Sequence, residues 1–121
     1  MFINEFKTDQ EISMFLLLDN VIRGVAASGK PYLTLYLKDK TGSIDGKIWE
    51  VKDEDSENLK AGKMIHVEGT LLDYRGKLQL KIKNYRMEND YTQDEFAKLI
   101  GVSKRTLLLY EQGKRFPKQK E

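Results

Sequence analysis

Three aromatic residues alternate with lysines along two neighbouring stretches of the chain. Tyr32 and Tyr36 stand four residues apart, and Trp49 follows in the second stretch, with Lys38 and Lys47 interleaved. An aromatic ring can stack on any base, because every base has a π-face, and a lysine can neutralise a phosphate. These residue types at this spacing predict a surface that binds a single nucleic-acid strand.

Two loops add similar side chains. Lys30 precedes the first stretch, and the segment Tyr74, Arg75, Gly76, Lys77 has the composition of a tight hairpin turn. The competing interpretation is that the aromatic residues are ordinary strand residues, since β-strands favour them in any case. We therefore expect a binding face made of nine residues, which are Lys30, Tyr32, Tyr36, Lys38, Lys47, Trp49, Tyr74, Arg75 and Lys77.

The composition excludes several kinds of chemistry. The chain has 121 residues, no cysteine and one histidine, so disulfides, thiolate metal sites and multi-histidine centres are ruled out. We expect His66 to be a structural or surface histidine. The cluster Asp53, Glu54, Asp55 should be solvated, because adjacent carboxylates on one turn point in different directions. No metal, no cofactor and no catalytic residue are predicted.

The location follows from similar arguments. A chain without cysteine suits a reducing compartment. The longest apolar run, residues 14–18, is far shorter than the roughly 20 residues that span a bilayer. Residues 1–11 are too acidic for a signal peptide. We expect a cytoplasmic protein with no membrane partner.

Hydrophobic alternation with period two dominates the chain up to residue 88. It predicts five strands, over residues 15–26, 32–38, 43–50, 63–73 and 77–87. Leu33, Leu35 and Leu37 share one face of the second strand, and the tyrosines lie on the other. The polar residues 51–59 predict a short helix or an ordered loop. Five strands with this insertion indicate a mainly β fold, an OB-fold Greek-key barrel; an SH3-type barrel, which lacks the insertion, is the alternative.

The same region carries motifs of a known family. The strings are GKPYLTL at 29–35, KDKTG at 38–42, GKIWE at 46–50, GKMIHVEG at 62–69 and YRGKLQL at 74–80. In order and spacing they resemble the N-terminal OB domain of the bacterial YhaM-type 3′–5′ exoribonucleases. The resemblance implies that residues 12–88 grip a single strand. The metal-dependent HD hydrolase domain of that family has no counterpart in this sequence, so its nuclease activity is not expected here.

Helical spacing replaces the alternation after residue 88. Thr92 and Glu95 form a capping-box pattern, Gly101 separates two short helices, and Ser103 can cap the second. The pattern resembles the helix-turn-helix of Cro- and lambda-repressor-like regulators over residues 92–117. The matching residues are Gln93, Ala97, Gly101, Val102, Ser103, Thr106, Glu111, Gly113, Arg115 and Pro117. The resemblance implies that Ser103, Lys104 and Arg105 face duplex DNA and that Gln93 contacts a phosphate.

The helical pair has more than one predicted role. Two short helices cannot bury enough apolar surface to be stable alone. We expect them to dock on the barrel, to pair in a homodimer through outward residues such as Leu108 and Leu109, or to fray. The domains are thus residues 1–88, an OB-fold nucleic-acid-binding domain, and 89–121, a helix-turn-helix-like segment.

Charge separates these two regions. Residues 1–88 hold 14 basic and 14 acidic side chains, whereas residues 101–120 hold six basic side chains and one acidic side chain.

Binding of single-stranded RNA or DNA by the barrel is the favoured hypothesis. Duplex-DNA recognition, a role as the subunit of a separate hydrolase, and protein binding are the alternatives. The sequence leaves open the choice between RNA and DNA, and whether the chain is whole, truncated or fused.

Overall fold

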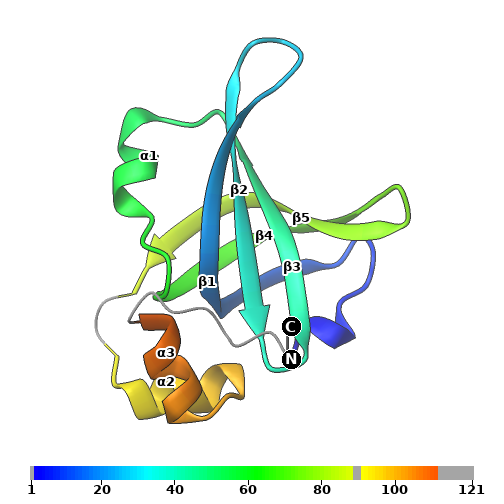
Figure 1. Ribbon diagram of the computed structural model, residues 1–121. Helices are drawn as coiled ribbons and strands as arrows, with labels where there is room; N and C mark the ends of the chain where they lie inside the picture. Colours follow the sequence, from blue (N-terminus) through cyan, green and yellow to red (C-terminus); the bar gives the residue numbers. More distant parts are fainter. Residues whose placement is uncertain (1, 89–90, 112–121) are drawn as a thin grey trace, which may run out of the picture.

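The computed structural model describes residues 2–88 and 91–111, and it contains a closed five-stranded barrel. Figure 1 shows two hairpins projecting from the barrel and a helical pair beneath it. The elements in chain order are η1 (Ile3–Glu5), β1 (Glu11–Val25), β2 (Pro31–Asp39), β3 (Gly42–Trp49), α1 (Asp53–Asn58), β4 (Met64–Tyr74), β5 (Lys77–Met87), α2 (Gln93–Ile100) and α3 (Lys104–Glu111).

The strand order around the barrel is β1, β2, β3, β5, β4, so consecutive strands are not always neighbours. β3 and β5 pair in parallel, with Asp45 opposite Gln79, and the remaining pairs are antiparallel. Helix α1 is inserted between β3 and β4, which the SH3-type alternative lacks. The predicted OB-fold barrel is confirmed.

Strand β1 begins four residues earlier than the sequence predicted, at Glu11 rather than at residue 15. Its first half pairs with β4 and its second half pairs with β2. The register between β1 and β2 shifts between Leu18 and Asn20, which changes the phase of the alternation along the strand. The other four strands start and end within one residue of their predicted bounds.

The barrel interior is filled by aliphatic side chains from all five strands. Leu35 and Leu37 of β2, Ile65 and Val67 of β4, and Leu80 of β5 have no exposed surface. Because inward residues alternate with outward residues along each strand, this packing fixes which side chains face solvent. The residues predicted to face outward on β2 and β3 are exposed or half-buried, except Thr34 of β2, which is buried.

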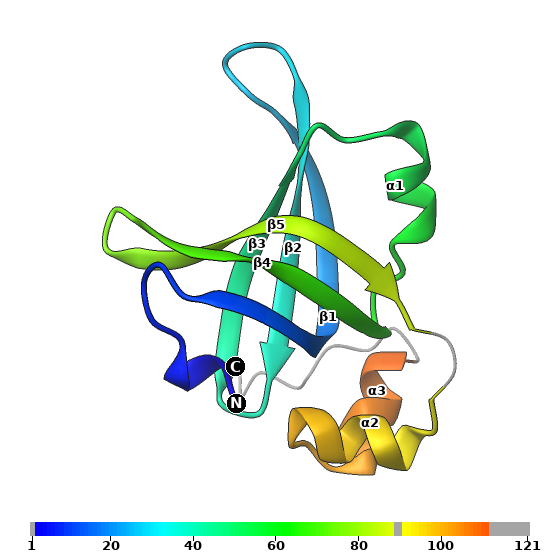
Figure 2. The ribbon, with the colours of Figure 1, turned by 180° about the vertical axis from the view of Figure 1, so that it is seen from behind.

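A second apolar cluster joins the helical pair to one end of the barrel. Leu17 of β1 and Met64 of β4 pack with four buried residues of the pair, which are Phe96, Ala97, Ile100 and Leu107. The amide of Lys40, in the β2–β3 turn, donates a hydrogen bond of 2.9 Å to the carbonyl of Ile100. Of the predicted outcomes, docking on the barrel is the one observed, and Figure 2 shows it from behind.

The capping box and the terminal glycine that the sequence predicted for the first helix of the pair are both present. Thr92 Oγ1 accepts a hydrogen bond of 3.1 Å from the Glu95 amide, and Glu95 Oε1 accepts one of 2.9 Å from the Thr92 amide. These hydrogen bonds lower the pKa of Glu95. Gly101 ends α2 with a φ of 81°, a left-handed conformation that favours glycine.

Among the helices of the described residues, none has the length and apolar character needed to cross a membrane.

Candidate nucleic-acid interface

Two projecting hairpins flank the outward face of β2 and β3. The β1–β2 hairpin rises at the top of Figure 1, and the β4–β5 hairpin extends to the right. Lys30 is exposed in the first hairpin, where Gly29 has a φ of 88°. Arg75 and Gly76 form the tip of the second, both with positive φ, and Asp73 Oδ1 accepts a hydrogen bond of 2.8 Å from the Gly76 amide. A polymer lying across β2 and β3 would pass between these tips.

An aromatic pair lies at the end of the face near the β1–β2 hairpin. Tyr32 and Trp49 are directly opposite each other on β2 and β3. Their ring centroids lie 5.1 Å apart with an interplanar angle of 47°. Trp49 is 46% exposed although it is the largest apolar side chain in the protein. A half-exposed indole supported by a second ring is suited to stacking on a base.

Lys47 places a positive charge beside this pair. Its Nζ lies 4.7 Å from the centroid of the Tyr32 ring and donates a hydrogen bond of 2.5 Å to Thr34 Oγ1. Thr34 is the cross-strand partner of Lys47, so both contacts follow from the β2–β3 register. The ammonium is thus held near the aromatic pair instead of moving freely in solvent.

The next row of outward residues is centred on Tyr36, which is half-buried. Its neighbours are Asn20 on β1 and Asp45 on β3. Lys77, from the β4–β5 hairpin, forms an ion pair of 3.9 Å with Asp45. The predicted residues Tyr36 and Lys77 are therefore brought to the same part of the face, although they are 41 positions apart in the sequence.

Tyr74 and Arg75 continue the face onto the second hairpin. Tyr74 is 56% exposed, and the guanidinium carbon of Arg75 lies 5.3 Å from the centre of its ring. Tyr74 is also the cross-strand partner of Lys77. The hairpin therefore repeats the combination of a ring and a cation seen with Tyr32 and Lys47.

Lys38 is placed differently from the other predicted lysines. It forms an ion pair of 3.6 Å with Asp19, whose side chain is only 8% exposed. It lies toward the end of β2 near the β2–β3 turn, on which the helical pair docks. Because the charge of Lys38 is partly compensated by the Asp19 carboxylate, we expect Lys38 to attract a phosphate less strongly than Lys47 does.

Sequence reasoning did not assign three outward residues of the same face. Ile22 of β1 is 49% exposed and lies opposite Thr34. Lys81 of β5 lies opposite Lys47, and Leu72 of β4 lies opposite Gln79. The alternation of β5 was visible in the sequence, but its partner strand was not. Because the register shifts after Leu18, the alternation of β1 did not predict on which face of the sheet Ile22 lies.

The four candidate duplex contacts lie on the helical pair, at the other end of the barrel from the β1–β2 hairpin (Figure 1). Ser103 caps α3, since its Oγ accepts a hydrogen bond of 3.1 Å from the Thr106 amide. Lys104 forms an ion pair of 3.5 Å with Asp94, Arg105 is exposed and Gln93 is half-buried. The structure therefore does not bring the duplex candidates and the barrel face together.

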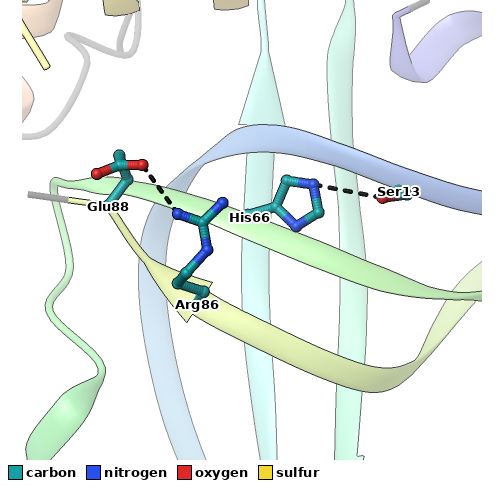
Figure 3. Close-up of polar contacts among 4 residues, drawn as sticks. All are labelled: Ser13, His66, Arg86 and Glu88. Atoms are coloured by element: carbon teal, nitrogen blue, oxygen red, sulfur yellow. Dashed lines mark hydrogen bonds and ion pairs between the residues drawn. The ribbon is translucent and has the colours of Figure 1, made fainter. Parts of the chain in front are cut away.

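His66, the single histidine of the sequence, lies where β1 pairs with β4, away from the outward face of β2 and β3. Figure 3 shows His66 directed toward Ser13, with 3.3 Å between Nε2 and Oγ, and Arg86 directed toward Glu88 at 3.0 Å. The centroids of the His66 and Phe15 rings lie 4.8 Å apart, with an interplanar angle of 73° that is typical of an edge-to-face pair. Within residues 2–88 and 91–111, no three His, Cys, Asp or Glu side chains are grouped to hold a metal ion.

The acidic cluster at α1 has a structural contact. Asp55 accepts a hydrogen bond of 2.5 Å from the Tyr85 hydroxyl, which ties α1 to β5. Burial and this hydrogen bond raise the pKa of Tyr85 above its ordinary value. Asp53 and Glu54 are exposed, as predicted for a solvated turn, whereas Asp55 is half-buried, so the prediction is wrong for Asp55.

A closed barrel of order β1, β2, β3, β5, β4, with rings and cations between two projecting hairpins, defines an OB-fold protein. Residues 21–88 match the family described as OB-fold nucleic acid binding domain, and the chain belongs to this family. Residues 82–121 match a family described as helix-turn-helix. Both matches agree with the resemblances seen in the sequence motifs.

A named relative is similar to this chain over most of the chain's length. The 3′–5′ exoribonuclease YhaM of Listeria monocytogenes serotype 4b is 33% identical over 103 residues, which is 83% of this chain and 33% of the relative. The chain therefore spans about a third of the length of this relative. The resemblance to YhaM-type exoribonucleases is confirmed at the level of sequence similarity.

Solved structures share the fold. A domain of replication protein A from Methanococcus maripaludis has a TM-score of 0.59 at 24% identity and covers 72% of this chain and 92% of that chain. A replication protein A heterotrimer bound to single-stranded DNA has a TM-score of 0.56 at 19% identity, covering 74% of this chain and 66% of that one. At these identities the similarity establishes the barrel fold.

Proposed function

We propose that this protein binds single-stranded RNA or DNA on the outward face of β1, β2 and β3, between the two projecting hairpins. Bases would stack on the rings, and cations beside the rings would neutralise phosphates. The stacking residues are Tyr32, Tyr36, Trp49 and Tyr74, and the phosphate contacts are Lys30, Lys38, Lys47, Arg75 and Lys77.

The observation that carries the proposal is the half-exposed Trp49 against Tyr32, with Lys47 held beside the same ring. Stacking is worth about 1–3 kcal/mol per base. Because residues 1–88 carry equal numbers of acidic and basic side chains, attraction by net charge is weak, and stacking must supply most of the affinity.

The relatives fit this proposal. The chain resembles an exoribonuclease, whose substrate is RNA by name, and shares the fold of a protein solved with single-stranded DNA. The family matched by residues 21–88 is described as a nucleic acid binding domain. We propose that the chain binds a strand without cleaving it, so an end-labelled oligonucleotide should stay intact when incubated with the protein and Mg²⁺ or Mn²⁺. A cytoplasmic location, where such strands occur, is part of the proposal.

The only tryptophan provides the direct test. The protein is titrated with a single-stranded oligonucleotide and then with the matching duplex, and Trp49 fluorescence is followed at two salt concentrations. The proposal expects quenching by the single strand that weakens as salt rises. Unchanged Trp49 fluorescence with every single strand would contradict it.

A second candidate function is the binding of duplex DNA by residues 89–121. What favours it is that docking buries the apolar side of the pair against Leu17 and Met64 and leaves Ser103, Lys104 and Arg105 exposed. It predicts that the anisotropy of a labelled duplex rises on binding and that removal of residues 89–121 abolishes the rise. Pairing of two copies through Leu108 and Leu109 belongs to this candidate, and these side chains lie outside the described part of the structure.

A further inference from the structure

One acidic side chain lies in the middle of the proposed binding face. Asp45 of β3 is directly opposite Tyr36 on β2 and directly opposite Gln79 on β5. Side chains of directly opposite residues project from the same face of a sheet. Across the antiparallel β2–β3 pair, their Cβ atoms are about 4.5–5.5 Å apart. Tyr36, Asp45 and Gln79 therefore form one row across three strands, in which a carboxylate lies between a ring and an amide.

The ion pair of Asp45 leaves its carboxylate accessible. The Lys77 ammonium is 3.9 Å away, and the two side chains are 30% and 75% exposed for Asp45 and Lys77 respectively. Exposed ion pairs of this length are weak, because solvent screens them. A phosphate arriving at the hairpin can take the place of Asp45 beside Lys77, and this frees the carboxylate for another partner.

The chemistry of a carboxylate restricts that partner. An ionised carboxylate only accepts hydrogen bonds and repels phosphate oxygens, so on this face it must point at a base or a sugar. Guanine offers two parallel donors on its Watson–Crick edge, N1–H and the 2-amino group. Uracil and thymine offer one N–H between two carbonyl oxygens, and adenine and cytosine offer one amino group beside an acceptor nitrogen.

We propose that Asp45 is a specificity-determining residue that recognises the Watson–Crick edge of a guanine stacked on Tyr36. The two carboxylate oxygens accept from N1–H and the 2-amino group, and the Gln79 amide can donate to O6. This inference rests on the proposed function, because it assumes that a strand lies on this face. It adds that the protein prefers strands carrying a guanine at one position.

The test compares uridine nonamers that differ only at the central position, which holds uracil, adenine, guanine or inosine. Thymidine nonamers with the same substitutions serve as the DNA counterparts. Fluorescence anisotropy of the labelled strands gives each affinity. The wild-type protein should bind the guanine strand about tenfold more tightly than the uracil strand. Inosine lacks the 2-amino group and keeps N1–H, so its strand should fall between the two.

Two variants separate recognition from structure. Asp45→Asn should lose the preference for guanine and bind the uracil strand at least as well as the wild type, because a repulsive charge is removed. Lys77→Gln removes the same ion pair but keeps the carboxylate, so it should retain the preference at lower overall affinity. Thermal unfolding of both variants, followed by circular dichroism, establishes that the barrel is intact.

The outcomes distinguish this inference from the proposal beneath it. If the wild type binds all four strands equally, or if Asp45→Asn keeps the guanine preference, Asp45 does not read the base, although the strand-binding proposal stands. If Asp45→Asn weakens binding to every strand by the same factor, its role is structural and the inference is wrong. If the wild type binds no strand, both proposals fail.

Discussion

Gly24 lies directly beneath the ring of Tyr32. A Cβ built on Gly24 would come within 2.5 Å of Cζ of the Tyr32 ring, and the two residues are cross-strand partners on β1 and β2. The missing side chain lets the ring lie against the sheet, where it also contacts Trp49. A glycine thus sets the position of the aromatic pair at the end of the proposed interface near the β1–β2 hairpin.

The substitution Gly24→Ala should therefore weaken single-strand binding without unfolding the barrel. The nearest atoms belong to the far end of the Tyr32 side chain, so the ring can move aside at small cost to stability. The expected loss of affinity approaches that of Tyr32→Ala, within the range of about 1–3 kcal/mol for one stacked base. The Trp49 emission spectrum should also shift, because its ring loses its neighbour. Wild-type affinity in a folded Gly24→Ala protein would show that the Tyr32 ring takes no part in binding.

Loss of a stacking ring gives the second prediction. Trp49→Ala and Tyr36→Ala should each weaken single-strand binding by about 1–3 kcal/mol, measured with a labelled oligonucleotide by anisotropy. Leu99→Ala is the matched control. Leu99 is an apolar side chain about as exposed as Trp49, and it lies on α2, away from the face. Equal affinities for all three variants would place the strand elsewhere.

The sequence predicted most of the fold because its signals were local. Alternation showed that Leu33, Leu35 and Leu37 face inward, and the capping pattern at Thr92 marked the start of α2. The early start of β1 was missed because this strand serves two partners and changes phase after Leu18.

The site was harder to predict because it depends on contacts between distant residues. Nothing near Lys38 in the sequence indicates its pairing with Asp19, and nothing near Asp45 indicates Gln79. Both contacts require the order in which strands lie around the barrel, including the parallel pairing of β3 and β5. Residue types therefore suggested the face, and only the strand register shows how its charges are arranged.

This arrangement of charges yields a third prediction, on two lysines that the sequence treated alike. Lys47→Ala should weaken single-strand binding and reduce the dependence of log affinity on log salt by about 0.7, the value for one phosphate contact on a single strand. Lys38→Ala should change both quantities less, because Lys38 is paired with Asp19. Affinities measured over a range of salt concentrations give both numbers. Equal effects of the two substitutions would mean that the Lys38–Asp19 pair opens when the strand binds.

The fourth prediction concerns the division of the chain into residues 1–88 and 89–121. Phe96 has no exposed surface and packs in the cluster with Leu17 and Met64. Substitution of a buried phenylalanine by alanine lowers the free energy of unfolding by about 3–5 kcal/mol. Two short helices have little stability apart from such packing. Phe96→Ala should therefore release the helical pair and leave the barrel, whose core is a separate cluster, intact.

Limited proteolysis followed by mass measurement can detect this release. Phe96→Ala should be cut rapidly after residue 88, whereas the wild type and Leu99→Ala, which changes an exposed residue of the same helix, should resist. Because the proposed strand-binding face is made by β1, β2 and β3 and the β4–β5 hairpin, single-strand affinity should stay within a factor of two of wild type, a range that corresponds to about 0.4 kcal/mol. If the affinity instead falls with the release of the helices, the pair contributes to strand binding, and the boundary near residue 88 does not separate two independent functions.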